Sequence, residues 1–177
     1  MNKHTYAITI NTERLSIAPL SEKDAPFIVE LLNTDGWIKY IGDRNIHTKA
    51  EAITYIQKIH EKPNINYWTV SLKETPAAIG VVTLIKRDYL DFQDIGFAFL
   101  PQYSQKGYAR EATKAVLTQL AKQNIIEKIL AITLPANKSS IKLLEKLGLK
   151  FRETIQQDNE QLHLYAASVQ ELNQSGA

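Results

Sequence analysis

The chain has 177 residues, of which 44% are hydrophobic and 23% are charged, and these values are ordinary for one globular domain. It contains no cysteine, which excludes disulfides, thiolate metal sites and a cysteine nucleophile. Its 21 basic and 19 acidic residues give a net charge of +2 without a basic block, which disfavours nucleic-acid binding. The N-terminus lacks a signal-like apolar segment, and no run approaches the ~20 apolar residues of a membrane span. We therefore expect a cytoplasmic protein that binds neither nucleic acid nor membrane.

The N-terminal third predicts one strand followed by two helices. Residues 12–20 alternate apolar and polar side chains, as a half-buried strand does. Ser21 with Asp24, and Thr48 with Glu51, have the spacing of a capping box at a helix start. Apolar residues at helical spacing follow each box: Phe27, Ile28, Leu31 and Leu32 after the first, and Ala52, Ile53, Ile56 and Ile59 after the second. The intervening residues 33–45 are rich in turn formers and predict a loop.

The remainder of the chain predicts a sheet interrupted by two helices. Residues 66–72 and 77–85 are apolar runs joined by "KETP", which indicates a hairpin, and residues 89–100 are a third antiparallel candidate. The elements expected next are a helix at 107–122, a strand at 128–134, a helix from Asn137 to Gly148, and strands near 149–156 and 161–169. We predict an α/β (α+β) fold, with a mixed, mostly antiparallel sheet and flanking helices. One domain is expected over residues 1–172, followed by a flexible tail at 173–177.

The segment "SQKGYAREA", residues 104–112, joins the third of these strands to its helix through a single glycine. A helix start has unpaired backbone N–H groups and a partial positive charge, so a loop wrapped around it forms an anion site. Gly107 permits a tight turn, Ala109 keeps the helix start small, and Lys106 adds a positive charge. In the alternative interpretation, Gly107 only ends the loop and Ala109 only packs. One glycine before a helix does not identify a ligand by itself.

Two separated motifs resemble the acetyl-coenzyme A site of the GNAT acetyltransferase superfamily. The first is "DIGFAFLPQYSQKGYAREA" (94–112), which is similar to that superfamily's strand, pyrophosphate loop and helix. The second is "PANKSSIKLLEKLGLKF" (135–151), which is similar to its later helix. Upstream, "WIKYIGDRNIHTKAEAITYI" (37–56) resembles the subgroup that includes ribosomal-protein N-terminal acetyltransferases. The resemblance covers nearly the whole chain.

This resemblance implies splayed central strands and acetyl-coenzyme A (acetyl-CoA) as cosubstrate. The strand ending near residue 100 is expected to diverge from the strand at 128–134, so that the pantetheine arm hydrogen-bonds in the gap like an extra strand. Asn137 is expected to contact this arm, to cap its helix, or to do both. Ser140 is expected near the sulfur; in the alternative it only caps the helix or is solvated. The cofactor-binding residues that the resemblance implies are Phe97, Ala98, Phe99, Leu100, Gln105, Lys106, Gly107, Tyr108, Ala109, Arg110, Asn137 and Ser140.

The implied reaction needs a neutral amine in line with the thioester, a donor to the developing oxyanion and a proton for the leaving thiolate. A backbone N–H near Ala98 or Phe99 is the expected donor. Asp94 is the candidate base for the amine's proton; alternatively it is a solvated strand residue or a substrate-binding charge. Many GNAT members have a tyrosine acid where this chain has Leu144. We therefore expect Ser140 or water to protonate the thiolate, or the thiolate to leave unassisted.

Three residues of the loop at 33–45 are candidates for binding the acceptor: Trp37, Tyr40 and Arg44. In the alternative, the two aromatic residues anchor the core and Arg44 pairs with Asp43. The expected activity is direct N-acetylation of a primary amine, either a protein or peptide N-terminus or a small amine, by a monomer or homodimer. The histidines are too scattered to predict a metal. A non-catalytic acetyl-CoA sensor is the alternative function, because Leu144 has no proton to give.

Overall fold

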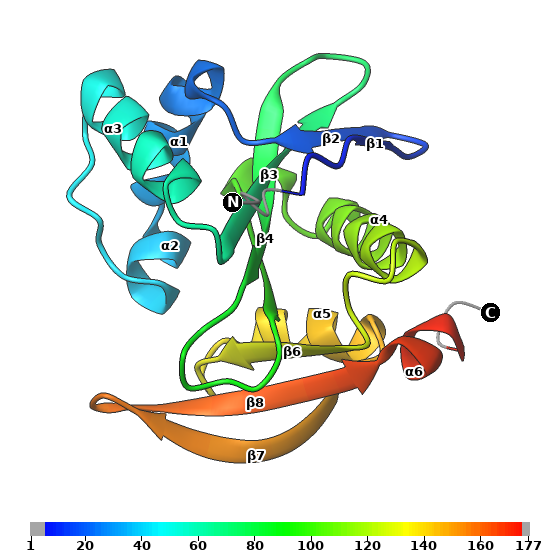
Figure 1. Ribbon diagram of the computed structural model, residues 1–177. Helices are drawn as coiled ribbons and strands as arrows, with labels where there is room; N and C mark the ends of the chain where they lie inside the picture. Colours follow the sequence, from blue (N-terminus) through cyan, green and yellow to red (C-terminus); the bar gives the residue numbers. More distant parts are fainter. Residues whose placement is uncertain (1–5, 175–177) are drawn as a thin grey trace.

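The computed structural model describes residues 6–174, and these form one eight-stranded sheet with helices on both faces (Figure 1). The strands are β1 (Ile10–Asn11), β2 (Leu15–Pro19), β3 (Ile65–Leu72), β4 (Ala78–Ile85), β5 (Asp94–Phe99), β6 (Lys128–Thr133), β7 (Lys150–Gln157) and β8 (Glu160–Ser168). The helices are α1 (Ala25–Leu32), α2 (Asp35–Tyr40), α3 (Lys49–His60), α4 (Tyr108–Lys122), α5 (Lys138–Lys146) and α6 (Val169–Gln174), with 3₁₀ turns at Glu22–Asp24 and Pro101–Tyr103.

The strands follow the order β1-β2-β3-β4-β5-β6-β8-β7 across the sheet. Every neighbouring pair is antiparallel except β5 with β6, which is parallel. In Figure 1, β6, β8 and β7 form a separate lower portion that diverges from β2–β4. The predicted fold class, a mixed and mostly antiparallel sheet with splayed central strands, is confirmed.

Two apolar clusters cover opposite faces of the first part of the sheet. One cluster packs α4 and α5 against the sheet, with Trp68, Val82 and Ile129 fully buried in it. The other packs α1, α2 and α3 against the reverse face, with Ile28 and Ile56 at its centre. Figure 1 shows α1–α3 grouped on one side of the strands and α4 and α5 on the other. Burial on both faces fixes the strand register, because a one-residue slip would turn each apolar side chain to the wrong face.

Both predicted capping boxes are present. Thr48 Oγ1 accepts a hydrogen bond from the Glu51 N–H at 3.2 Å, and Glu51 Oε2 accepts one from the Thr48 N–H at 2.9 Å. The box formed by Ser21 and Asp24 starts a 3₁₀ turn that leads into α1, and Asp24 Oδ2 also accepts a bond from Thr69 of β3. This second contact ties the start of α1 to the sheet.

The structure contains three short elements where the sequence predicted none. The segment expected as a loop includes α2, whose start is capped by Thr34, because its Oγ1 accepts from the Trp37 N–H at 3.3 Å. Strand β1 has only two residues, too few for a visible alternation. Helix α6 reaches Gln174, two residues into the predicted tail, and residues 175–177 lie outside the described part of the chain. Strand β5 begins at Asp94 rather than at residue 89.

Candidate active site

The two central strands, β5 and β6, separate almost as soon as they meet. They share a single pair of facing residues, Asp94 with Leu130. Beyond it, β5 continues only alongside β4, as far as Phe99, and β6 continues only alongside β8, as far as Thr133. A strand with one unpaired side offers backbone N–H and C=O groups to an extended ligand. The predicted gap is therefore present, and Phe97, Ala98, Phe99 and Leu100 lie along its β5 side.

The side chains that border the gap point to two opposite faces of the sheet, because side chains alternate along β5. Phe97 and Phe99 pack with the cluster under α4 and α5. Ala98 and Leu100 pack with the cluster under α1–α3, and Asp94 has the same parity. The gap is thus bordered by one apolar cluster on the α4–α5 side and by the other on the α1–α3 side.

The loop before α4 presents a series of free amides at one end of this gap. Gly107 has φ +82°, in the left-handed region, and is the N-cap of α4. Gln105 is also left-handed, at φ +60°. Within residues 6–174, the backbone N–H groups of 105–110 have no hydrogen-bond partner, whereas the next one, that of Glu111, donates to the Gly107 carbonyl at 3.0 Å. Successive free amides at a helix start suit an anion, as the sequence predicted for this loop.

Two residues that the sequence analysis missed contact this loop and the first turn of α4. Arg14, in the turn between β1 and β2, donates from Nε to Glu111 Oε2 at 2.7 Å and from Nη1 to the Lys106 carbonyl at 3.0 Å. Its guanidinium also lies over the Tyr108 ring, with Cζ 4.5 Å from the centroid. Thr12 Oγ1 donates to Glu111 Oε1 at 2.6 Å. Arg14 and Glu111 are 97 residues apart in the sequence, so no local pattern indicates their pairing.

Asn137 and Ser140 lie at the start of α5, on the other motif. Asn137 Oδ1 accepts from the Ser140 N–H at 3.2 Å and from Ser139 Oγ at 3.1 Å, so Asn137 is the helix cap. Its Nδ2 atom has no hydrogen-bond partner within the described residues, which leaves the amide a donor for a ligand. One side chain can therefore serve both expected roles. Ser140 is half-buried in the first turn of the same helix.

Leu144, which takes the place of the tyrosine acid of many GNAT members, belongs to the core. It is 1% exposed and packs in the cluster under α4 and α5. The leucine therefore has a packing role, and no proton donor stands at this position.

Asp94 is buried rather than solvated. Its residue is 3% exposed, and its Oδ1 accepts a hydrogen bond from Arg87 Nε at 3.0 Å. Burial raises the pKa of the Asp94 carboxyl, and the Arg87 guanidinium opposes that rise. The alternative of a solvated strand residue is wrong. A carboxylate whose pKa is raised, at the point where β5 and β6 part, has the chemistry of a proton acceptor.

The three acceptor-binding candidates occupy different environments. Trp37 is 4% exposed and packs within the α1–α3 cluster, which supports the packing alternative for it. Tyr40, at the end of α2, is half-buried, and the Lys39 Nζ lies 5.1 Å from its ring centroid. Arg44 is exposed. Its predicted pairing with Asp43 is absent, since Asp43 Oδ1 instead accepts from the Asn45 N–H at 2.8 Å.

A row of facing residues crosses β3 and β4 and ends on β5, the strand that borders the gap. Tyr67 of β3 faces Thr83 of β4, and Thr83 faces Gly96 of β5. A Cβ on Gly96 would lie 2.6 Å from Thr83 Oγ1, so only glycine fits there. Burial raises the pKa of the Tyr67 phenol, and the neighbouring Tyr55 adds to that rise. The sequence predicted the hairpin but not which of its side chains would meet at the gap.

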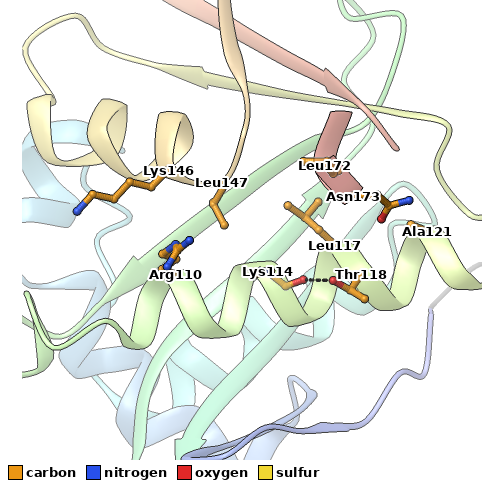
Figure 2. A pocket seen from close by; sticks show the side chains of 9 residues that line it. All are labelled: Arg110, Lys114, Leu117, Thr118, Ala121, Lys146, Leu147, Leu172 and Asn173. Carbon is orange, nitrogen blue, oxygen red and sulfur yellow. Dashed lines mark hydrogen bonds between the residues drawn. The ribbon is translucent and has the colours of Figure 1, made fainter. Parts of the chain in front are cut away.

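A small recess lies along α4, between it and the ends of α5 and α6. Arg110, Lys114 and Lys146 contribute cationic side chains to its lining, and Leu117, Leu147 and Leu172 contribute apolar ones. Figure 2 shows Arg110 projecting from α4 toward the α5 segment that carries Lys146 and Leu147. None of these three cations forms an ion pair within the described residues.

Within residues 6–174, no three His, Cys, Asp or Glu side chains gather closely enough to hold a metal ion. The helices of this part of the chain are all too short or too polar to cross a membrane.

Comparison with known proteins identifies the family to which this fold and site belong. The chain matches the family model described as "Acetyltransferase (GNAT) domain" over residues 14–150. Because this match covers most of the chain, the protein belongs to the GNAT acetyltransferase family and is an acetyltransferase.

Individual relatives agree with the family match. YnaD, an uncharacterized N-acetyltransferase of Bacillus subtilis (strain 168), is 29% identical over 155 residues, which are 85% of this chain and 90% of YnaD. The crystal structure of a GNAT-family acetyltransferase from Bacillus anthracis has a TM-score of 0.77 and 27% identity, covering 91% of this chain and 98% of that one. The ribosomal-protein-S5-alanine acetyltransferase of Vibrio fischeri has a TM-score of 0.70 at 19% identity, covering 91% and 96% of the two chains, and shares the fold.

Proposed function

We propose that the protein is an N-acetyltransferase that moves the acetyl group of acetyl-CoA directly to a primary amine. The observation that carries this proposal is a free edge of β5 with the unpaired amides of residues 105–110 at its end. An anion-binding helix start beside a strand that can pair with an extended amide chain suits a ligand with a diphosphate and a pantetheine arm. Coenzyme A combines both in one molecule.

Each part of the cofactor has a proposed partner in the site. The pantetheine arm binds the backbone of residues 97–100 and the Nδ2 of Asn137. Arg110, which lines the recess with Lys114 and Lys146, neutralises a phosphate of the adenosine portion. The amides proposed to bind the diphosphate are those of Gln105, Lys106, Gly107, Tyr108, Ala109 and Arg110.

Acetyl-CoA supplies an activated acyl group, and the chain's own residues supply position, a hydrogen-bond donor and a proton acceptor. A backbone N–H near Ala98 or Phe99 donates to the thioester oxygen as negative charge develops on it. Asp94 receives the amine's proton through a water molecule. Ser140 or water protonates the leaving thiolate, because Leu144 cannot. Transfer is proposed to be direct, and the absence of cysteine agrees with this.

The acceptor is proposed to approach from the α1–α3 side of the gap, opposite α4 and α5. It is the N-terminus of a protein or peptide, or a small amine. The guanidinium of Arg44 is exposed and has no ion pair among the described residues, so it is suited to a carboxylate on the acceptor. Tyr40 is the proposed aromatic contact next to it.

The proposal is tested by measuring thiol release from acetyl-CoA with a panel of N-terminal peptides and small amines. Acceptor-dependent release, with the acetyl group recovered on the amine, is the expected result. A thermal shift with CoA but no turnover on any acceptor would instead indicate an acetyl-CoA sensor. Loss of release with the amino group blocked is the control for transfer to nitrogen.

A further inference from the structure

The turn between β1 and β2 is joined to the loop before α4 by a dense set of polar contacts. Arg14 reaches Glu111 through its backbone N–H (3.1 Å to Oε1), its Nε (2.7 Å to Oε2) and its Nη2 (2.6 Å to Oε2). The remaining terminal nitrogen, Nη1, donates to the carbonyl of Lys106 at 3.0 Å. One guanidinium therefore binds both the first turn of α4 and the loop that precedes it.

The bond to Lys106 determines the direction of the next amide. The described residues contain no cis peptide bond, so the carbonyl of Lys106 and the N–H of Gly107 point in opposite directions from their shared peptide plane. Because Arg14 holds the carbonyl on its own side, the Gly107 N–H points away from Arg14. Gly107, at φ +82°, leads into α4, and the amides that follow it are also unpaired. Arg14 thus orients the Gly107 amide without itself donating to the ligand.

Arg14 also cancels a charge that would oppose anion binding. Glu111 lies one turn into α4, and its N–H already bonds the Gly107 carbonyl at 3.0 Å. Partial burial would raise the pKa of the Glu111 carboxyl, but hydrogen bonds from Thr12 and Arg14 together with the Arg14 charge hold it below its usual value. The carboxylate is therefore ionised next to the proposed diphosphate site. Because Nε and Nη2 of Arg14 both contact its Oε2, the ion pair leaves little net charge there.

We propose that Arg14, together with Glu111, is a positioning residue for coenzyme A: it fixes the Lys106–Gly107 peptide in the orientation that donates to the diphosphate, and neutralises Glu111 beside it. This inference rests on the proposed function, since it assumes that the loop binds a diphosphate. A purely structural role, tying β1 and β2 to α4, would stabilise the fold without affecting one ligand more than another.

The test uses the full-length chain and isothermal titration with CoA, alongside kinetics with acetyl-CoA. The variants are Arg14→Gln, Arg14→Lys and Arg14→Gln/Glu111→Gln, and the matched control is Arg152→Gln. Arg152 pairs only loosely with Glu171, at 3.8 Å, on the far strand β7, and its loss changes the net charge by the same amount. Thermal unfolding of each variant measures the structural contribution separately.

Arg14→Gln is expected to raise the Kd for CoA and the KM for acetyl-CoA about tenfold, as lost charge-assisted bonds typically do, with kcat within about twofold. The double variant recovers part of this loss, because the unpaired Glu111 charge is gone. Arg14→Lys keeps the charge but cannot bond Glu111 and the Lys106 carbonyl through three side-chain nitrogens, and is expected to weaken CoA binding about threefold. If Arg14→Gln does not fold, Arg14→Lys replaces it as the test variant. Arg152→Gln leaves the Kd unchanged.

The inference is overturned if folded Arg14→Gln, or Arg14→Lys in its place, binds CoA like the wild type, or if Arg152→Gln loses as much affinity. Failure of the proposed function looks different. A wild type that binds no CoA overturns both ideas, whereas a wild type that binds CoA without acetylating any amine overturns the enzyme alone.

Discussion

Replacing Gly107 with alanine tests the loop before α4 at the position where its backbone least tolerates a Cβ. At φ +82° a residue with a Cβ costs about 1–2 kcal/mol relative to glycine. The new Cβ would also lie 3.3 Å from Arg14 Nη2, closer than an ordinary contact. If the backbone stays in place, the free energy of unfolding falls by that amount, and a chain of this size loses about 2–8 °C in Tm. If the backbone instead rotates to relieve the strain, the amides of Gly107 and Tyr108 turn away.

Only the second response weakens CoA binding, and for it we expect about a tenfold rise in Kd by titration calorimetry, because two amide donors to a charged group are misplaced. Gly148→Ala is the matched control, because Gly148 has φ +94° at the end of α5, away from the loop. It should lose similar stability and keep its CoA affinity. Gly36→Ala, inside α2 with no atom near its added Cβ, should be neutral or slightly stabilising. The strain interpretation is excluded if Gly107→Ala keeps the wild-type Tm and binds CoA within about twofold of the wild type, while Gly148→Ala shows a normal strain penalty.

Three further predictions follow from buried or capped side chains. Asp94→Asn should lower kcat/KM for the amine by about 10²–10⁴. In the wild type, burial raises the pKa of Asp94, so kcat/KM should fall on the acid side at a pH above the ordinary carboxyl pKa, and the variant should lose this fall. An unchanged pH–rate profile would exclude Asp94 as the base. Leu144→Tyr should destabilise the fold by about 1–3 kcal/mol in a denaturant titration, because the space around Leu144 is already filled. It should not speed the reaction by supplying an acid. A faster and equally stable variant would contradict this packing role. Glu171 accepts hydrogen bonds from the Ser168 N–H and from Lys150, and these lower its pKa to about 2. Its contribution to stability is therefore full above pH 4.5 and is lost as the pH falls toward 2. Glu171→Gln should show a smaller drop in Tm over that interval, and a variant whose Tm falls with pH as in the wild type would argue against the pairing.

Local signals in the sequence predicted the elements that frame the site. Thr48 with Glu51, Asn137 and Gly148 each specify a helix end through their own backbone contacts, and the structure has all of them in those roles. Gly107 was identified for the same reason, because a left-handed residue before a helix favours glycine. These features depend on neighbours a few residues away, which a sequence displays directly.

Features that depend on distant contacts could not be predicted in this way. Arg14 meets Glu111 across 97 residues, and its role follows only from the packing of the β1–β2 turn against α4. Asp94 is placed beside Arg87, and buried, by the loop that shortens β5. Trp37 was a candidate both for binding the acceptor and for the core, and the structure buries it in the cluster under α1–α3. In each case tertiary packing, not residue type, decided the environment.

A crystal structure with bound CoA would show whether the loop before α4 binds the diphosphate. We predict diphosphate oxygens within hydrogen-bond distance of the amides of residues 105–110, with the pantetheine arm along the free edge of β5 and the sulfur at the opening between β5 and β6. A diphosphate bound elsewhere, with those amides still unpaired or facing only solvent, would contradict it.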